Sequence, residues 1–145
     1  MKKSARISVI AKIEEAKERE EARKLAEYQR EVLDKKIKLQ ELEGFLNEYK
    51  ERFMKLTRFG ASADKIRSSH AFISQLNKAI SQQHNAVVEA ERAADEYREQ
   101  WVRAKRRMEI LQKAVNNLRR QERQHEDRKE QLTIDELARR KRQAY

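Results

Sequence analysis

The side chains best suited to chemistry are few in this sequence and stand far apart. Its three histidines are His70, His84 and His125, and it has no cysteine. A metal site needs several ligands around one ion, and nucleophilic catalysis needs an activated side chain beside a base. No such spacing and no glycine-rich phosphate loop is present, and the many carboxylates alternate with basic residues as on a helix surface. We therefore expect no enzyme activity, no metal and no cofactor, with the histidines at the surface.

A heptad repeat of apolar residues runs through the second half of the chain and predicts a coiled-coil helix. The first row of this repeat holds Ile66, Ile73, Ile80, Val87, Ala94, Trp101, Met108 and Val115. The second row, three residues further on, holds Ser69, Leu76, Gln83, Ala90, Tyr97, Ala104, Leu111 and Leu118. We refer to the two rows of a helix together as its seam.

The first half of the chain carries a second seam. Its rows are Leu25, Val32, Leu39, Leu46 and Phe53, and Tyr28, Lys35, Leu42, Tyr49 and Leu56. Upstream of these rows the phase slips, because Glu18 and Glu21 fall on the seam. The apolar Val9, Ile10 and Ile13 lie on a shifted stripe. We expect looser packing in this upstream part.

A short turn separates the two seams. Gly60 can adopt the left-handed conformation that ends a helix, and Ser62 can cap the next helix. A short link makes neighbouring helices antiparallel. The predicted fold is therefore all-α: a single coiled-coil domain over 1–145, with one helix over about 3–58, a turn over about 59–62 and a second helix over about 63–140.

The register of the two seams supports this hairpin. Leu46 and Leu76 lie equally far from residue 61, as do Leu42 and Ile80, so facing rows centre on the turn. The same symmetry places Tyr28 opposite Ala94. It also places Leu118 where the first helix runs out, so 119–145 should project beyond the first helix.

Apolar side chains beside the seams predict a lateral surface. Phe45 and Phe72 lie on the flank just before the first seam row, and the register brings them together. The opposite flank is polar and includes Lys36 and Glu91. Exposed aromatic residues on a polar rod favour a docking surface, although both rings could instead widen the core. Gly44 favours docking, because its missing side chain would let a partner approach.

The charge of the chain is high but dispersed. The net charge is +10, yet residues 1–60 alone combine 16 basic with 12 acidic side chains. A phosphate-binding face normally concentrates its excess charge, so we expect no nucleic-acid partner. No apolar run approaches the ~20 residues that span a bilayer, and none near Met1 could be a signal-peptide core. We expect a cytoplasmic protein, peripheral to any membrane complex.

The sequence resembles the FliJ family of flagellar type III export proteins over essentially the whole chain, and a few segments carry this resemblance. They are 42–49 (LEGFLNEY), 72–80 (FISQLNKAI), Gln82, Trp101 before a basic stretch, and 134–138 (IDELA). The off-seam aromatic residues and the Asp135–Glu136 ending are more specific than the heptads. The resemblance implies a stalk that binds the export ATPase FliI and the cytoplasmic domain of the export gate FlhA, and that assists delivery of export substrates and chaperones at the inner-membrane flagellar base.

The resemblance also implies which residues make these contacts. The gate-docking patch would comprise Leu42, Phe45, Tyr49, Phe72, Leu76, Ala79 and Gln83, although His84 could fill the polar role at its end. The ATPase would contact the termini, for which Ile10, Ile13, Leu132 and Leu137 are the candidates.

Three alternatives remain open from the sequence. The chain could be the corresponding stalk of an injectisome, or a basic coiled-coil scaffold that binds RNA or anionic lipid with steep salt dependence. It could also dimerise through its long helices without folding back, whereas the hairpin predicts a monomer.

Overall fold

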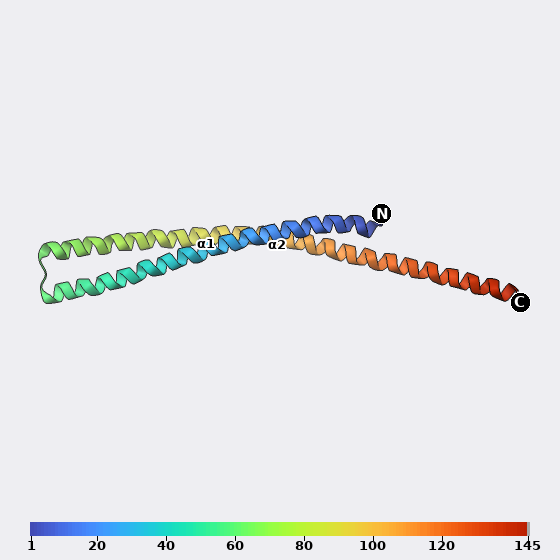
Figure 1. Cartoon of the computed structure of the whole chain (residues 1–145). Helices are drawn as coiled ribbons and strands as arrows, with labels where there is room; N and C mark the ends of the chain where they lie inside the picture. Colours follow the sequence, from blue (N-terminus) through green and yellow to red (C-terminus); the bar gives the residue numbers. More distant parts are fainter. Residues whose placement is uncertain (145) are drawn as a thin grey trace. The chain divides into compact units, whose positions relative to one another are not determined.

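The computed structural model describes residues 1–144, so Tyr145, which belongs to the predicted domain and projecting segment, lies outside it. Two helices account for nearly all of this length: α1, Lys3–Phe59, and α2, Ala63–Ala144. They pack against each other, and no strand occurs among the described residues (Figure 1). The predicted all-α fold with a longer second helix is therefore confirmed. Whether the chain is one domain stays a prediction.

The chain reverses direction at Gly60, where φ is +77°. The amide of Ala61 donates to the carbonyl of Leu56 at 3.1 Å, which closes the last turn of α1. Glycine adopts this left-handed conformation without the steric cost that a Cβ brings. Ser62 then caps α2, since its Oγ accepts from the amide of Lys65 at 3.3 Å. The two helices leave this turn antiparallel, as the green segments of Figure 1 show.

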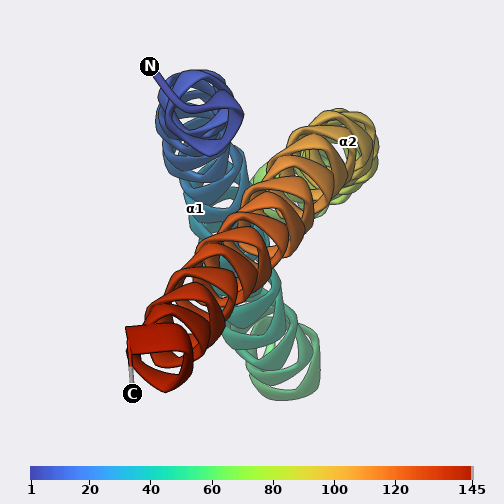
Figure 2. The ribbon, with the colours of Figure 1, turned by 90° about the vertical axis from the view of Figure 1, so that its right-hand side faces the viewer.

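Contacts between the helices fall into two compact units. The hairpin unit comprises Ala22–Gln100, and the terminal unit comprises Met1–Glu21 with α2 from Trp101 onward. In Figure 2 the blue start of α1 and the orange and red part of α2 belong to the terminal unit.

The hairpin unit buries a narrow apolar stripe. Leu25, Leu76, Val87 and Ala94 form its most buried part, and all four belong to the predicted seams. On the polar flank Lys36 Nζ lies 3.2 Å from Glu91 Oε1, across the two helices. Tyr28, expected opposite Ala94, stacks its ring on Tyr97 with ring centroids 4.8 Å apart. A tyrosine ring gains more contact area against another ring than against a methyl group, and this offset stacking is favourable.

The terminal unit has a small and polar contact between the helices. Ser4, Ala11, Ala104 and Val115 are buried. The indole Nε1 of Trp101 donates to Glu18 at 2.9 Å, and the amide of Gln112 donates to Glu15 at 2.7 Å. Val9, Ile10 and Ile13 are each about half exposed, so the apolar stripe of this segment does not enter the core.

The start of α1 is tied to α2 by carboxylates. Ser4 donates from its Oγ to Glu122 at 2.6 Å and from its backbone amide at 3.1 Å, so Glu122 caps α1 from the other helix. Lys2 Nζ pairs with Glu126 at 2.6 Å. The contacts of Ser4 with Glu122 and of Lys2 with Glu126 together form a clasp at the start of α1. Beyond this clasp every side chain of α2 to Ala144 is exposed, so α2 extends past α1 as predicted. Neither helix contains, within the described residues, a stretch apolar enough to span a membrane.

Candidate docking surface

The predicted docking patch lies entirely in the hairpin unit. Leu42, Phe45 and Tyr49 recur at helical spacing on α1, and Phe72, Leu76 and Ala79 do the same on α2. The rings of Tyr49 and Phe72 meet across the two helices with centroids 4.4 Å apart and planes tilted by 48°. This contact agrees with the expected register and joins the two halves of the patch.

Members of the patch differ in how far they are buried. Leu76 is 9% exposed and belongs to the core, whereas Leu42, Tyr49 and Ala79 are partly covered. Phe72 remains 39% exposed and Phe45 50% exposed. Phe72 therefore contributes one face to the core through Tyr49, while Phe45 presents half of its surface to solvent. A half-exposed phenyl ring is available for a partner to bury.

The surroundings of Phe45 are open. Gly44 is exposed, and a Cβ built on it would have no heavy atom within 4 Å. Packing within this chain would therefore allow a side chain at position 44. At the other side of the patch, the guanidinium of Arg52 lies 5.4 Å from the centre of the Tyr49 ring. This cation–π contact holds a positive charge beside the apolar surface.

Gln83, the predicted polar end of the patch, bridges the helices. Its side-chain amide donates to the backbone carbonyl of Lys35 at 3.0 Å, and the residue is partly buried. His84 is exposed. Gln83 thus has a structural partner within the chain, while His84 is the more accessible of the two polar side chains. Which of them a partner contacts stays a prediction.

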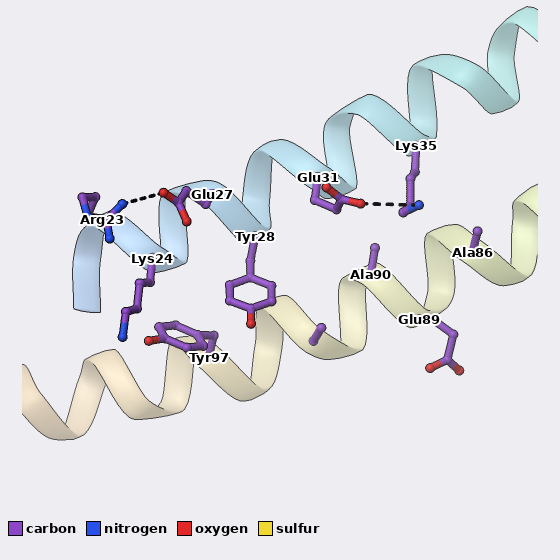
Figure 3. Close-up of a pocket in the computed structure, with 11 residues that line it drawn as sticks. Arg23, Lys24, Glu27, Tyr28, Glu31, Lys35, Ala86, Glu89, Ala90 and Tyr97 are labelled. Atoms are coloured by element: carbon purple, nitrogen blue, oxygen red, sulfur yellow. Dashed lines mark hydrogen bonds and ion pairs between the residues drawn. The ribbon is translucent and has the colours of Figure 1, made fainter. Parts of the chain in front are cut away.

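A groove that sequence reasoning missed lies further along the hairpin unit. Its floor is formed by Ala86, Ala90 and Ala93 of α2, and the stacked Tyr28 and Tyr97 line one end (Figure 3). Ion pairs from α1 line its rim, between Arg23 and Glu27 at 2.6 Å and between Lys35 and Glu31 at 3.5 Å. The sequence could have indicated this groove, because the small residues Ala79, Ala86 and Ala93 continue the heptad row of Phe72.

The candidate ATPase-contacting residues all lie in the terminal unit and are exposed. Ile10 and Ile13 are about half exposed on α1, and Leu132 and Leu137 are more exposed on the extension of α2. Ile134 is exposed on the same extension. The structure therefore leaves these apolar side chains without a cover inside the chain, and their role stays a prediction.

The clasp at the start of α1 perturbs its charged groups. Hydrogen bonds from Ser4 hold the pKa of Glu122 below its ordinary value of 4.5. The hydrogen bond from Lys2 likewise lowers the pKa of Glu126 and raises the pKa of Lys2 above 10.5. Each shift favours the charged form that makes the contact. No cluster of three potential metal ligands occurs among residues 1–144.

The fold is an antiparallel coiled-coil hairpin, and an aromatic patch lies along the hairpin unit. The family model that matches this chain is the flagellar FliJ protein, over residues 2–144. The chain therefore belongs to the FliJ family. Comparison with curated proteins and with solved structures gave no match. Family membership identifies a coiled-coil protein of flagellar export, which agrees with the resemblance seen in the sequence and favours the flagellar over the injectisome reading.

Proposed function

We propose that this protein is a non-enzymatic stalk of the flagellar type III export apparatus. It links the export ATPase FliI to the cytoplasmic domain of the export gate FlhA, at the cytoplasmic side of the inner-membrane flagellar base. It also assists delivery of export substrates and their chaperones. Membership of the FliJ family supports the flagellar assignment. A helical rod suits this role because it presents fixed surfaces without needing a catalytic pocket.

The gate-docking role rests on the exposed phenyl ring of Phe45. Phe45 stands beside Gly44, where there is open space, and Phe72 and Tyr49 form an aromatic pair in the same patch. A partner that covers Phe45 gains the burial of half an aromatic side chain. Binding through this surface should depend little on salt, because its central contacts are apolar.

The ATPase-contacting role is assigned to the terminal unit. Ile10 and Ile13 on α1, and Leu132 and Leu137 on α2, supply exposed apolar side chains near the chain ends. The extension of α2 beyond Glu126 has no α1 residue to pack against, so its apolar side chains are available to a second protein.

Two binding measurements test the proposal. Purified protein is titrated into the cytoplasmic domain of the gate and, separately, into the ATPase. The double variant Phe45→Ala with Phe72→Ala should lose gate binding and keep ATPase binding. The double variant Leu132→Ser with Leu137→Ser should show the reverse. The proposal would be refuted if the unmodified protein bound neither the cytoplasmic domain of the gate nor the ATPase.

Motility provides the test in cells. A deletion strain complemented with the wild-type gene should swim, and one complemented with the Phe45 and Phe72 double alanine variant should not. The control is Leu33→Ala, because Leu33 is a similarly exposed apolar residue of α1 in the same unit. Equal loss of motility with Leu33→Ala would show that the effect is not specific to the patch.

A further inference from the structure

The two helix faces that meet in the terminal unit differ in chemistry. The seam of α2 is apolar at every position from Trp101 to Leu118, where it consists of Trp101, Ala104, Met108, Leu111, Val115 and Leu118. All of these residues are buried or partly buried, and Ala104 is fully buried. Such a face is typical of a helix that binds an equally apolar partner helix.

The face that α1 supplies is largely polar. The facing seam positions are Ser4, Ile7, Ala11, Glu14, Glu18 and Glu21. Ile7 is the one large apolar side chain among them, and all six positions lie within the described residues. In the hairpin unit the corresponding positions of α1 hold mainly leucine, valine and aromatic residues.

Two of these glutamates are only partly satisfied, although the Oε1 of Glu14 accepts from Lys17 Nζ at 3.4 Å. One carboxylate oxygen of Glu14 and one of Glu21 are buried without a hydrogen-bond partner. The guanidinium Nε of Arg107 lies 3.8 Å from that oxygen of Glu14, which permits attraction but is too long for a hydrogen bond. A buried polar atom without a partner makes the contact less favourable, because it has lost its water.

Three large apolar side chains of the same segment face away from α2. Val9, Ile10 and Ile13 are about half exposed. Helical spacing puts them on one stripe, on the side of α1 away from the seam. The segment therefore buries carboxylates against an apolar face and exposes its own apolar stripe. An amphipathic helix with leucines on its seam would cover α2 better.

The charge around the α2 face indicates the chemistry of a replacement helix. Beside the seam between Trp101 and Arg120 stand three basic side chains, Lys105, Arg107 and Arg119, with Gln112 and Ala114 at the other flanking positions and no acidic residue among them. The carboxylates of Glu15, at the edge of the contact, and of Glu18, on the seam, already accept hydrogen bonds from Gln112 and Trp101. A helix with acidic residues beside an aliphatic seam would match both the apolar face and its basic borders.

We propose that the first part of α1, Lys3–Glu21, is a displaceable cover of a helix-binding face on α2, and that the occupant of this face is an acidic amphipathic helix of a partner protein. This surface is separate from the lateral patch, and the inference does not depend on the proposed gate contact.

A peptide competitor tests whether the face accepts another helix. The probe is a fluorescently labelled peptide of residues 3–21 with Glu14→Leu, Glu18→Leu and Glu21→Leu on its seam. Lys12→Glu, Lys17→Glu and Arg19→Glu make it acidic outside the seam, where it also keeps Glu15 and Glu20. It should bind the full chain and change the emission of Trp101, the single tryptophan of the protein. No binding of the peptide at micromolar concentrations would overturn the proposal.

A covalent lock supplies the matched control. The chain has no cysteine, so Ser8→Cys and Asn116→Cys, which line one hollow between the helices, can be joined by a short bismaleimide. The peptide should bind the locked protein at least about tenfold more weakly than the same variant without the linker, a difference of about 1.4 kcal/mol. Equal binding to both forms would place the peptide elsewhere and refute the cover.

Hydrogen exchange tests the weakness of the cover itself. In the full chain, Glu14→Leu with Glu21→Leu should slow amide exchange over residues 5–21 by about tenfold or more, because the contact becomes apolar on both sides. The control Lys12→Leu with Arg19→Leu replaces two exposed charges of the same segment and should leave the exchange nearly unchanged. Exchange that is already as slow in the wild type as in Ala22–Phe59 would show that no weak cover exists.

Discussion

Replacement of Phe45 by alanine should weaken gate binding much more than it destabilises the fold. A fully buried phenylalanine contributes about 1.5–3 kcal/mol relative to an exposed one. Phe45 is 50% exposed, so its loss should lower the free energy of unfolding by about 1 kcal/mol. If Phe45 is an anchor of the interface, the same change should cost at least about 2 kcal/mol of binding, or about a 30-fold rise in Kd.

The neighbouring positions set the scale for this comparison. Phe72 is 39% exposed and also contacts Tyr49, so Phe72→Ala should cost about 2 kcal/mol of stability from lost burial and lost ring contact. Leu76 is 9% exposed, and Leu76→Ala should cost about 2–5 kcal/mol because a buried leucine leaves a cavity. The expected order of destabilisation is therefore Leu76, then Phe72, then Phe45.

Urea unfolding followed by far-UV circular dichroism measures the stability of each variant, and isothermal calorimetry with the cytoplasmic gate domain measures the Kd. Leu33→Ala is the control, since Leu33 is 56% exposed on α1 and outside the patch. It should resemble Phe45→Ala in stability and the wild type in binding. A loss of stability for Phe45→Ala as large as that for Leu76→Ala would refute the reasoning, because the ring would then belong to the core.

Three further predictions concern the backbone and the clasp. Gly44→Ala should raise the free energy of unfolding by up to about 1 kcal/mol, because alanine favours a helix over glycine and the new Cβ meets no neighbour. The same change should weaken gate binding, because the added methyl group stands where the partner approaches the backbone. Urea unfolding measures the first effect and calorimetry the second. Gly60→Ala should destabilise the hairpin by about 1 kcal/mol or more in the same unfolding assay, since φ is +77° at that residue. Acidification should loosen the start of α1, because the lowered pKa of Glu122 contributes stability above pH 4.5 that is lost as the pH falls below 4.5. Nuclear magnetic resonance should show the Ser4 amide leaving its hydrogen bond in that range. A Glu122→Ala variant should show no such transition.

The helical hairpin could be predicted from sequence because its determinants are local or periodic. The heptad rows select one face of each helix, and Gly60 with Ser62 ends one helix and starts the next. The aromatic patch was also within reach, because Phe45 and Phe72 stand on the same flank once the seams are aligned about the turn.

Contacts between particular side chains were not predictable in the same way. Heptad symmetry placed Tyr28 opposite Ala94 but did not show that its ring stacks on Tyr97. A row assignment gives the direction of a side chain but not which way a long ring leans. The amide of Gln83 bound to the carbonyl of Lys35, and the capping of α1 by Glu122, depend likewise on side-chain reach across the two helices.

The sequence by itself determined that this protein forms two long amphipathic helices with a turn between them, because propensity, periodicity and turn chemistry all act over a few residues. Only the tertiary structure decided how the carboxylates on the seam of the first part of α1 are satisfied, because hydrogen bonds depend on side-chain reach across the two helices. Glu18 accepts a hydrogen bond from Trp101, whereas one oxygen each of Glu14 and Glu21 is buried without one.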